Sequence, residues 1–462
     1  MEGRDRLGGT PPEEATARTQ CRSELPPNLA RVKQAAQRDR RTKFTALLHH
    51  VDVESLGRAF ARLRRGASPG VDGRTDAQYE QDLAANLAAL HQRVQRGSYK
   101  PLPVRRVHIA KADGGHRPLG ILSLEDKIVQ GAVTELLTVI YEEQFHGFSY
   151  GFRPGRSCHQ ALEAVQTALM RQSVNYVLDA DIRSFFDSVD HEWLLRMVAH
   201  KIADPRILRL LERWLKAGVL ESGEWKATET GTPQGAGISP LLANIFLHYA
   251  LDNWVAKGAR EGAWGEMFIV RYADDFVLGF KQERDGREMW AALQARLGKF
   301  GLRLHEEKTR LIEFGRFAAE RRAQRGQRRP ETFNFLGFTH YCSQSREGRF
   351  VVKRKTQSKR LARKLTAVRE EAWRRMHRPV AEQHQWLSQV LRGHYAYFGL
   401  PCNLPALKSF GHEVKRIWFR ALRRRSRKTR VNWQRFSDLL AQFPLPEPHI
   451  THPWLPVQAV SR

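Results

Sequence analysis

Hydrophobic residues recur with helical spacing through the first part of the chain. Apolar side chains stand three or four positions apart from Phe44 to Leu63, and again from Tyr79 to Val94. This spacing places them on one face of an α-helix, so two helical regions are expected. A loop rich in Gly and Pro, residues 66–73, separates them. A mixed helix is also expected over residues 122–141.

Short apolar runs bounded by turn residues predict strands further along. Residues 104–111 and 117–121 flank the segment Asp113-Gly114-Gly115, which is a strong turn signal, so a hairpin is expected. Residues 175–180 predict a separate strand that leads directly into Asp181. A carboxylate delivered at the end of a strand, just before a turn and a helix, is a recurrent arrangement at functional sites.

A second hairpin is predicted over residues 268–280, where apolar runs flank the adjacent Asp274 and Asp275. Aspartates favour turns because their carboxylates accept hydrogen bonds from nearby backbone N–H groups. Side chains alternate between the faces of a strand, so the two carboxylates are expected to point apart. A lone pair of aspartates is more often a solvated turn, and its meaning depends on the other motifs of the chain.

The C-terminal third shows helical periodicity combined with a strong excess of positive charge. Arg423 to Arg430 alone carries six cations in eight residues. A small basic helical domain that holds a nucleic-acid backbone is expected here, followed by an extended Pro-rich end from Phe443 to Pro456. The apolar positions form three stripes: Leu361, Leu365, Val368, Ala372 and Met376; Trp386, Leu387, Val390 and Leu391; and Leu407, Phe410, Val414, Ile417 and Leu422.

Composition narrows the class of protein. The 462 residues suffice for two or three domains, and 41% hydrophobic with 27% charged residues is typical of a globular protein. The net charge of +28 indicates a polyanionic partner, for which nucleic acid is the usual candidate. No run of eighteen apolar residues and no apolar signal segment occur, so neither a membrane span nor secretion is expected. The four cysteines form no Cys-x-x-Cys pair, which argues against a zinc module and fits a reducing cytoplasm.

Three loops carry candidate ligand contacts. Residues 148–157 combine Gly, Pro and Arg with aromatic residues, a composition suited to a sugar-phosphate backbone and stacked bases. Residues 231–242 form a Gly-rich approach to a helix, with Ser239 as the expected N-cap and Pro240 in the first helical position. Lys111 and Arg117 flank the first hairpin, and two cations on a flexible hairpin suit a triphosphate.

In chain order, the strand-end Asp181, the Thr232-Pro-Gln-Gly235 loop and the Tyr272-Ala-Asp-Asp275 hairpin resemble a reverse transcriptase palm. The closest likeness is to the reverse transcriptase–maturases of bacterial group II introns, and it runs from about Phe44 to the C-terminal tail. Further blocks that resemble the family are Arg117-Pro-Leu-Gly-Ile121, Tyr150-Gly-Phe-Arg-Pro154, Glu307-Lys-Thr309, Phe335-Leu-Gly-Phe338 and Leu391 to Phe398.

The resemblance implies an α+β fold shaped as a right hand. Fingers and palm would carry an antiparallel sheet, and an all-α thumb or maturase domain would follow. Many relatives end in a zinc-bearing endonuclease, whereas this sequence resembles the subgroup that lacks one. The implied division is a basic, partly disordered lead-in over 1–43, fingers and palm over 44–345, a helical basic thumb or maturase domain over 346–440, and a Pro-rich tail over 441–462.

The implied chemistry is joining of a primer 3′-hydroxyl to the α-phosphate of a dNTP, with two Mg²⁺ ions that clamp the attacking and leaving oxygens. Asp181 and Asp274 would be metal ligands, with Asp275 beside them. Phe186 would crowd a ribose 2′-hydroxyl, and Lys308 would donate a proton to the leaving pyrophosphate. Other implied contacts are Lys111, Arg117 and Gln234 with the nucleotide, and Arg153, Arg156 and Gly337 with template or primer.

The expected function is therefore an RNA-directed DNA polymerase that binds RNA template, DNA primer or target, and its own intron RNA, and that assists splicing and retrohoming. Two alternatives stay open. One is a splicing maturase that binds RNA without catalysis. The other is a domesticated reverse transcriptase in defence or repair, which the presence or absence of flanking intron RNA would distinguish. The sequence leaves the oligomeric state undetermined.

Overall fold

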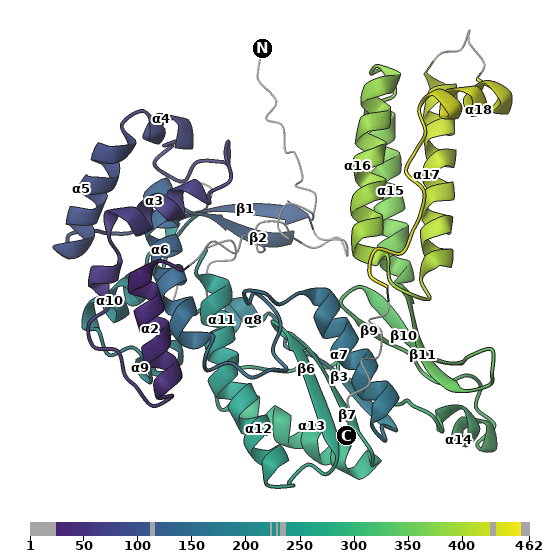
Figure 1. Ribbon diagram of the computed structural model, residues 1–462, viewed down its shortest axis with the longest axis horizontal. Helices are drawn as coiled ribbons and strands as arrows, with labels where there is room; N and C mark the ends of the chain where they lie inside the picture. The colour runs from purple at the N-terminus through teal and green to yellow at the C-terminus, as the bar shows by residue number, and fades with distance from the viewer. Residues whose placement is uncertain are drawn as a thin grey trace. The chain divides into compact units, whose positions relative to one another are not determined.

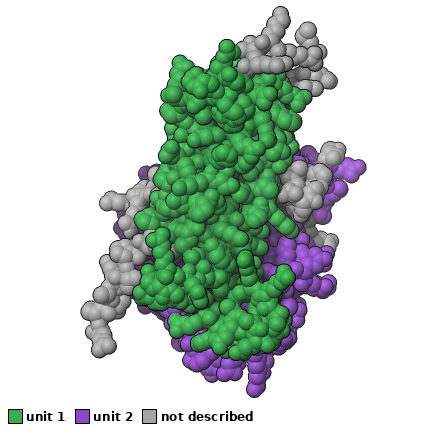
Figure 2. All heavy atoms as spheres, turned by 90° about the vertical axis from the view of Figure 1, so that its right-hand side faces the viewer, with its two compact units in different colours: residues 1–22, 314–462 green, residues 23–313 purple. Residues whose placement is uncertain are grey.

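The computed structural model describes residues 25–110, 116–221, 224–227, 230–231, 237–425 and 431–453. The chain divides into two compact units between Glu313 and Phe314, which are coloured separately in Figure 2. The first unit is Ser23–Glu313, and the second contains Phe314–Arg462. Residues 314–345 thus group with the helical region, whereas the sequence placed them with the fingers and palm. No helix in the described ranges is long and apolar enough to cross a membrane.

Helices dominate the start of the first unit and confirm the helical pattern of the sequence (Figure 1). The single helix expected from Tyr79 to Val94 is divided in two, since one helix ends at Glu80 and the next begins at Leu83. The first of them starts earlier than expected, because Thr75 and Gln78 form a capping box. The longest of these helices, α6, is buried on most of its surface and contacts α2, α3 and α11 (Ser239–Leu247). The elements are α2 (Pro27–Arg38), a 3₁₀ turn (Leu48–His50), α3 (Val53–Ala61), α4 (Asp76–Glu80), α5 (Leu83–Gln95) and α6 (Leu124–Tyr141).

The first predicted hairpin belongs to a four-stranded sheet in the order β2-β1-β4-β5. β1 (Val104–Ala110) and β2 (His116–Ile121) are antiparallel, as the sequence predicts, and β1 runs parallel to β4 (Val219–Glu221). β5 (Glu224–Lys226) completes the sheet at its other edge.

The second predicted hairpin lies in a fully antiparallel sheet in the order β6-β7-β3-β8. Its strands are β3 (Tyr176–Asp181), β6 (Met267–Tyr272), β7 (Asp275–Phe280) and β8 (Arg310–Glu313). Leu178 pairs with Leu278 and Ala180 pairs with Phe276, so these four apolar side chains share one face. That face joins the main core together with Met289, Leu293 and Leu297 of α13 (Glu283–Gly298). The opposite face carries Asp179 and Asp181, because side chains alternate along β3.

Of the remaining helices of the first unit, α7 lies beside the strands of this sheet, whereas α9 and α10 lie near α2 and away from it (Figure 1). α7 contacts both β6 and β7 and begins, as expected, after Ser157, whose capping box with Gln160 satisfies free N–H groups. The expected N-cap Ser239 is instead the first residue of α11, and Ile238 precedes it. The helices are α7 (Cys158–Arg171), α8 (Phe185–Ser188), α9 (His191–Ala199), α10 (Pro205–Leu215), α11 (Ser239–Leu247), a π-helical turn (His248–Asp252) and α12 (Asn253–Arg260).

The second unit combines a three-stranded sheet, in the order β11-β10-β9, with a helical bundle. All three predicted apolar stripes face the core of this bundle, which confirms them. Two features differ from the expectation: α18 was not predicted, and β11 lies inside the region assigned to helices alone. The elements are α14 (Ala318–Gln324), β9 (Phe333–Phe335), β10 (Phe338–Gln344), β11 (Phe350–Thr356), α15 (Ser358–Arg374), α16 (Val380–Phe398), α17 (Leu404–Arg424) and α18 (Trp433–Gln442).

Candidate active site

The β-sheet brings the three predicted carboxylates to one end of its central strands. Asp181 is the last residue of β3 and pairs in register with Asp275, the first residue of β7. Side chains of directly opposed residues share a face, with Cβ atoms about 4.5–5.5 Å apart. Asp274 precedes Asp275 in the turn that joins β6 to β7. The expected hairpin with its aspartates at the tip is therefore present.

The turn itself contains two residues, because Tyr272 pairs with Asp275 across it. Ala273 adopts a positive φ of 57°, a conformation that costs an L-residue roughly 1–2 kcal/mol. Positive φ at the first turn position matches the right-handed twist of a hairpin, where glycine is usual. The surrounding structure must hold Ala273 in this conformation.

The loop that starts near Phe148 packs directly against this turn. The backbone N–H of Arg271 donates to the carbonyl of Phe148, and the N–H of Tyr150 donates to the carbonyl of Arg271, both at 2.9 Å. A Cβ on Gly151 would lie 2.4 Å from the backbone nitrogen of Ala273. Only glycine therefore permits the observed approach of the loop to the turn.

Lys308 is the predicted residue that the structure joins to Asp181. Its Nζ lies 2.7 Å from Oδ2 of Asp181, and 61% of the Lys308 side chain is exposed against 29% for Asp181. The segment is fixed by the backbone, since the N–H of His305 donates to the carbonyl of Asp181 at 2.8 Å. An ammonium group thus balances one carboxylate of the acidic site.

The donor set suits Mg²⁺, which prefers carboxylate oxygens and completes its octahedral shell with water and substrate phosphates. Asp181 and Asp275 lie opposite one another, and Asp274 is the next residue along the chain. Among the described residues, no three or more His, Cys, Asp or Glu side chains already form a metal cluster. Ligation by a few carboxylates suits Mg²⁺ ions that bind together with substrate phosphates.

Phe186 lies in α8, five residues after Asp181 in the sequence. Its ring is half-buried and meets Phe185 edge-on, with 5.4 Å between the ring centroids. Gly231 packs against α8, because a Cβ there would lie 3.1 Å from the Phe186 carbonyl oxygen. Gly231 therefore lies beside Phe186.

The other predicted contacts are described to different extents. Lys111 and Gln234 lie outside the described residues, and the side chain of Arg117 is not described, although its backbone pairs with Ile109. Arg156 donates to the Gly147 carbonyl at 2.9 Å and stacks over the Tyr150 ring. Gly337 forms the turn between β9 and β10, with φ at 83°.

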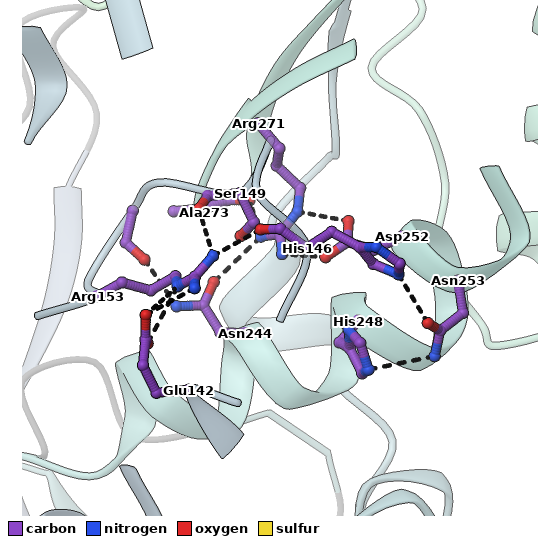
Figure 3. Close-up of polar contacts among 11 residues, drawn as sticks. Glu142, His146, Ser149, Arg153, Asn244, His248, Asp252, Asn253, Arg271 and Ala273 are labelled. Atoms are coloured by element: carbon purple, nitrogen blue, oxygen red, sulfur yellow. Dashed lines mark hydrogen bonds and ion pairs between the residues drawn. The ribbon is translucent and has the colours of Figure 1, made fainter. Parts of the chain in front are cut away.

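Arg153 differs from the expected contact with template or primer. It is 4% exposed, and its guanidinium binds Glu142 at 2.6 Å and the carbonyls of His146 and Ser149 (Figure 3). Its charge and donors are directed at the protein, so it is not available to a phosphate in this conformation. The structure instead gives Arg153 the role of anchoring the loop that leads to Gly151.

A buried polar group behind the turn was not predicted. It consists of Arg271, Asp252 and Asn244, which Figure 3 shows converging beside Ala273. The sequence offered one signal, since Arg271 is the single charged residue between Phe268 and Tyr272. Burial also raises the pKa of the neighbouring Tyr272, which favours its neutral phenol.

Comparison with known proteins supports the assignment of this site. A family model described as reverse transcriptase (RNA-dependent DNA polymerase) matches residues 109–340, a span that includes β3, the β6–β7 hairpin and Lys308. The chain belongs to the reverse transcriptase family. The resemblance proposed from the sequence blocks and the α+β fold class are thereby confirmed.

Relatives of this reverse transcriptase include group II intron proteins. Protein YkfC of Escherichia coli is 37% identical over 277 residues, which covers 53% of this chain and 72% of that protein. The group II intron-encoded protein LtrA of Lactococcus lactis is 36% identical over 233 residues, half of this chain. The matched region is only 38% of LtrA. A protein in the cob intron of Schizosaccharomyces pombe is 44% identical over 153 residues, which covers 33% of this chain and 19% of that protein.

Proposed function

We propose that this reverse transcriptase is an active RNA-directed DNA polymerase. The observation that carries the proposal is the register of β3 and β7, which sets Asp181 opposite Asp275 and beside the turn residue Asp274. Carboxylates brought this close repel one another unless cations lie beside them, so the arrangement favours bound cations. A protein that only binds RNA does not need such a group of carboxylates.

Asp181 and Asp274 would hold two Mg²⁺ ions, with Asp275 in support. When bound, the ions would polarise the reacting phosphate and stabilise charge on the attacking and leaving oxygens. Lys308 already lies beside Asp181 and would serve as a proton donor to the departing pyrophosphate. Phe186 would fill the space that a ribose 2′-hydroxyl needs, which favours dNTPs.

The remaining contacts follow the family resemblance. Lys111, Arg117 and Gln234 would contact the nucleotide, while Arg156 and Gly337 would contact template or primer. The basic helical region over 346–440 would act as thumb and maturase domain and would bind intron RNA in the cytoplasm. The relationship to LtrA, an intron-encoded protein, supports a role in splicing and retrohoming of a group II intron.

Primer extension by the purified protein tests the proposal, with RNA template, DNA primer, dNTPs and Mg²⁺. Asp274→Ala should reduce the rate of extension by about 100-fold or more. Metal ligation stabilises the transition state by several kcal/mol, and each loss of about 1.4 kcal/mol slows the reaction tenfold. Asp82→Ala, an exposed aspartate just before α5, is the matched control and should retain wild-type activity. Phe186→Ala should increase incorporation of rNTPs relative to dNTPs.

An inactive, well-folded wild type, tested with Mg²⁺ and Mn²⁺ at several salt concentrations, would contradict the proposal. It would then favour an RNA-binding maturase that keeps the palm without catalysis. Equal extension by wild type and Asp274→Ala would instead disprove the assigned metal site.

A further inference from the structure

A fully buried ion pair lies behind the turn that carries Asp274. Arg271, on β6, donates from Nε to Oδ1 of Asp252 at 2.8 Å and from Nη2 to Oδ2 at 2.5 Å. Both side chains are 0% exposed, so this is a bidentate pair removed from solvent (Figure 3). Burying two charges is expensive, and apolar residues of similar volume would often stabilise a fold as well. The pair therefore calls for an explanation beyond stability.

The remaining donor of Arg271 reaches the turn itself. Its Nη1 donates to the backbone carbonyl of Ala273 at 2.9 Å and to Oδ1 of Asn244 at 3.1 Å. Ala273 is the residue with positive φ, so the guanidinium holds the strained position directly. A planar guanidinium fixed by a bidentate carboxylate presents its third donor group in one orientation only.

Asn244 extends the network to the neighbouring loop. Its Nδ2 donates to the carbonyl of Gly151 at 2.7 Å while its Oδ1 accepts from Arg271. Asn244 is 1% exposed, and both ends of its amide are engaged. One connected set of hydrogen bonds thus binds the Gly151 loop and the Ala273 turn at the place where they pack together.

The helix that supplies Asn244 and Asp252 is interrupted between them by a π-helical turn, His248–Asp252. Residues eight apart in a regular α-helix differ by roughly 80° in direction, because each residue advances about 100°. A π-helical turn contains about one residue more than an α-helical turn. The side chains that follow it therefore point up to about 100° behind the direction they would have in a regular α-helix. The turn His248–Asp252 thereby brings Asp252 toward the side on which Asn244 lies, and both reach the same guanidinium.

We propose that Asp252, Arg271 and Asn244 form a brace that holds Asp274 in the position required for metal-dependent catalysis. None of the three is a catalytic residue, since they contact the backbone of the turn and of the loop. They are positioning residues, and the inference rests on the proposed polymerase function. Loss of the brace leaves the carboxylates present but less precisely placed.

The direct test is Asp252→Asn, which keeps the shape of the side chain and removes its charge. We expect kcat for primer extension to fall by about 10- to 100-fold, since a shift of about 1 Å at a reacting centre costs about 100-fold. The Mg²⁺ concentration for half-maximal activity should rise. The KM and Kd for the RNA–DNA duplex should stay within about threefold, because no brace residue is placed at that contact.

Asp204→Asn is the matched control. Asp204 is also 0% exposed and paired with an arginine, Arg206 at 3.2 Å, but it holds the backbone of Leu47 and Leu48. It should lower thermal stability without changing kcat or the Mg²⁺ requirement at a temperature where the protein is folded. Equal effects of both variants on kcat would overturn the brace and indicate general destabilisation.

Amide hydrogen exchange supplies a readout that does not depend on activity. In Asp252→Asn, exchange should accelerate in peptides covering 148–153 and 268–280, while Asp204→Asn should leave those peptides unchanged. If Asp252→Asn fails to fold, the same exchange measurement on Asn244→Ala tests the brace. This variant leaves the ion pair intact and should accelerate exchange at 148–153.

Unchanged exchange would overturn the proposal. An inactive wild type would refute the polymerase function alone, and exchange would still decide whether the brace holds the turn.

Discussion

Single residues set the tolerance of the active site to change, and Gly151 is the tightest of them. The missing Cβ of this residue would lie 2.4 Å from the Ala273 nitrogen and 3.0 Å from the Tyr272 carbonyl carbon. Both are backbone atoms, so no side chain can turn aside to make room. Any larger residue must displace the turn that carries Asp274 or the loop that carries Arg156.

Gly151→Ala should therefore reduce primer extension by about 10- to 100-fold, through a shift of the turn by a fraction of an ångström to about 1 Å. Gly147→Ala in the same loop is the control, since its Cβ would meet nothing within 4 Å. Steady-state kcat on a fixed RNA–DNA duplex is the measurement. Similar activity of the two variants would show that the loop yields without moving the turn.

At the level of side chains, the sequence predicted which residues carry charge but not where each charge points. Asp181, Asp274 and Asp275 were found because strand-end and turn positions follow from local pattern. Arg153 was assigned to nucleic acid, yet its partner Glu142 stands eleven residues earlier and turns it inward. Arg271 and Asp252 meet only after a helix and a strand have packed, so no local spacing reveals the pair.

At the scale of elements, periodicity located most of the helices and hairpins but missed α18, and it did not predict the chemistry of the turns. The β9–β10 turn shows this, because Leu336 and Gly337 both have positive φ, at 48° and 83°. Two positive values define the turn type that prefers Asn-Gly, and leucine is unfavourable in the first position. The start of α4 was missed because a capping box of Thr75 and Gln78 decides it, whereas α11 begins at Ser239 after Ile238 without a side-chain capping hydrogen bond.

Leu336→Asn should stabilise the second unit by about 0.5–1 kcal/mol, because asparagine tolerates the left-handed region and leucine does not. Gly337→Ala should destabilise it by about 1–2 kcal/mol, since alanine is strained at this φ. Urea denaturation of both variants against wild type measures the two changes. A lower midpoint for Leu336→Asn would mean that the packing of the leucine side chain outweighs its strained backbone.

For the molecule as a whole, charge favours nucleic-acid binding and buried histidines limit stability in acid. The net charge is +28, and these positive charges repel one another within the folded protein. Bound RNA should reduce this repulsion because its phosphates neutralise part of the charge. His248 in the first unit and His340 and His394 in the second are buried, and burial lowers the pKa of each to about 3. The unfolded chain takes up protons near the ordinary histidine pKa of 6.5, whereas the folded protein does not.

Stability should therefore be intact above pH 6.5 and should fall as the pH drops from 6.5 toward 3. Each such histidine costs about 1.4 kcal/mol per pH unit in this window, or about 2 kcal/mol at pH 5. His394→Phe keeps an aromatic ring against Phe410, whose centroid lies 3.8 Å away, and removes one titrating group. Between pH 7 and pH 5 the free energy of unfolding should fall by about 2 kcal/mol less in this variant than in wild type.

Chemical denaturation at the two pH values tests this difference. His412→Phe, at an exposed position on α17, is the control and should keep the wild-type pH response. An identical acid response in wild type and His394→Phe would show that His394 is protonated in the folded protein.

The π-helical turn at His248–Asp252 also limits which changes of chain length the protein can accept. Deleting one residue there would restore an ordinary α-helix and keep its apolar face nearly continuous, so the helix would still form. Asp252 and α12 would then keep nearly the same direction relative to α11, because the π-helical turn contains one residue more for the same rotation. A homologous chain can therefore lack one residue at this turn and keep α12 in place, whereas a one-residue gap elsewhere in the helix would turn everything after it by about 100°.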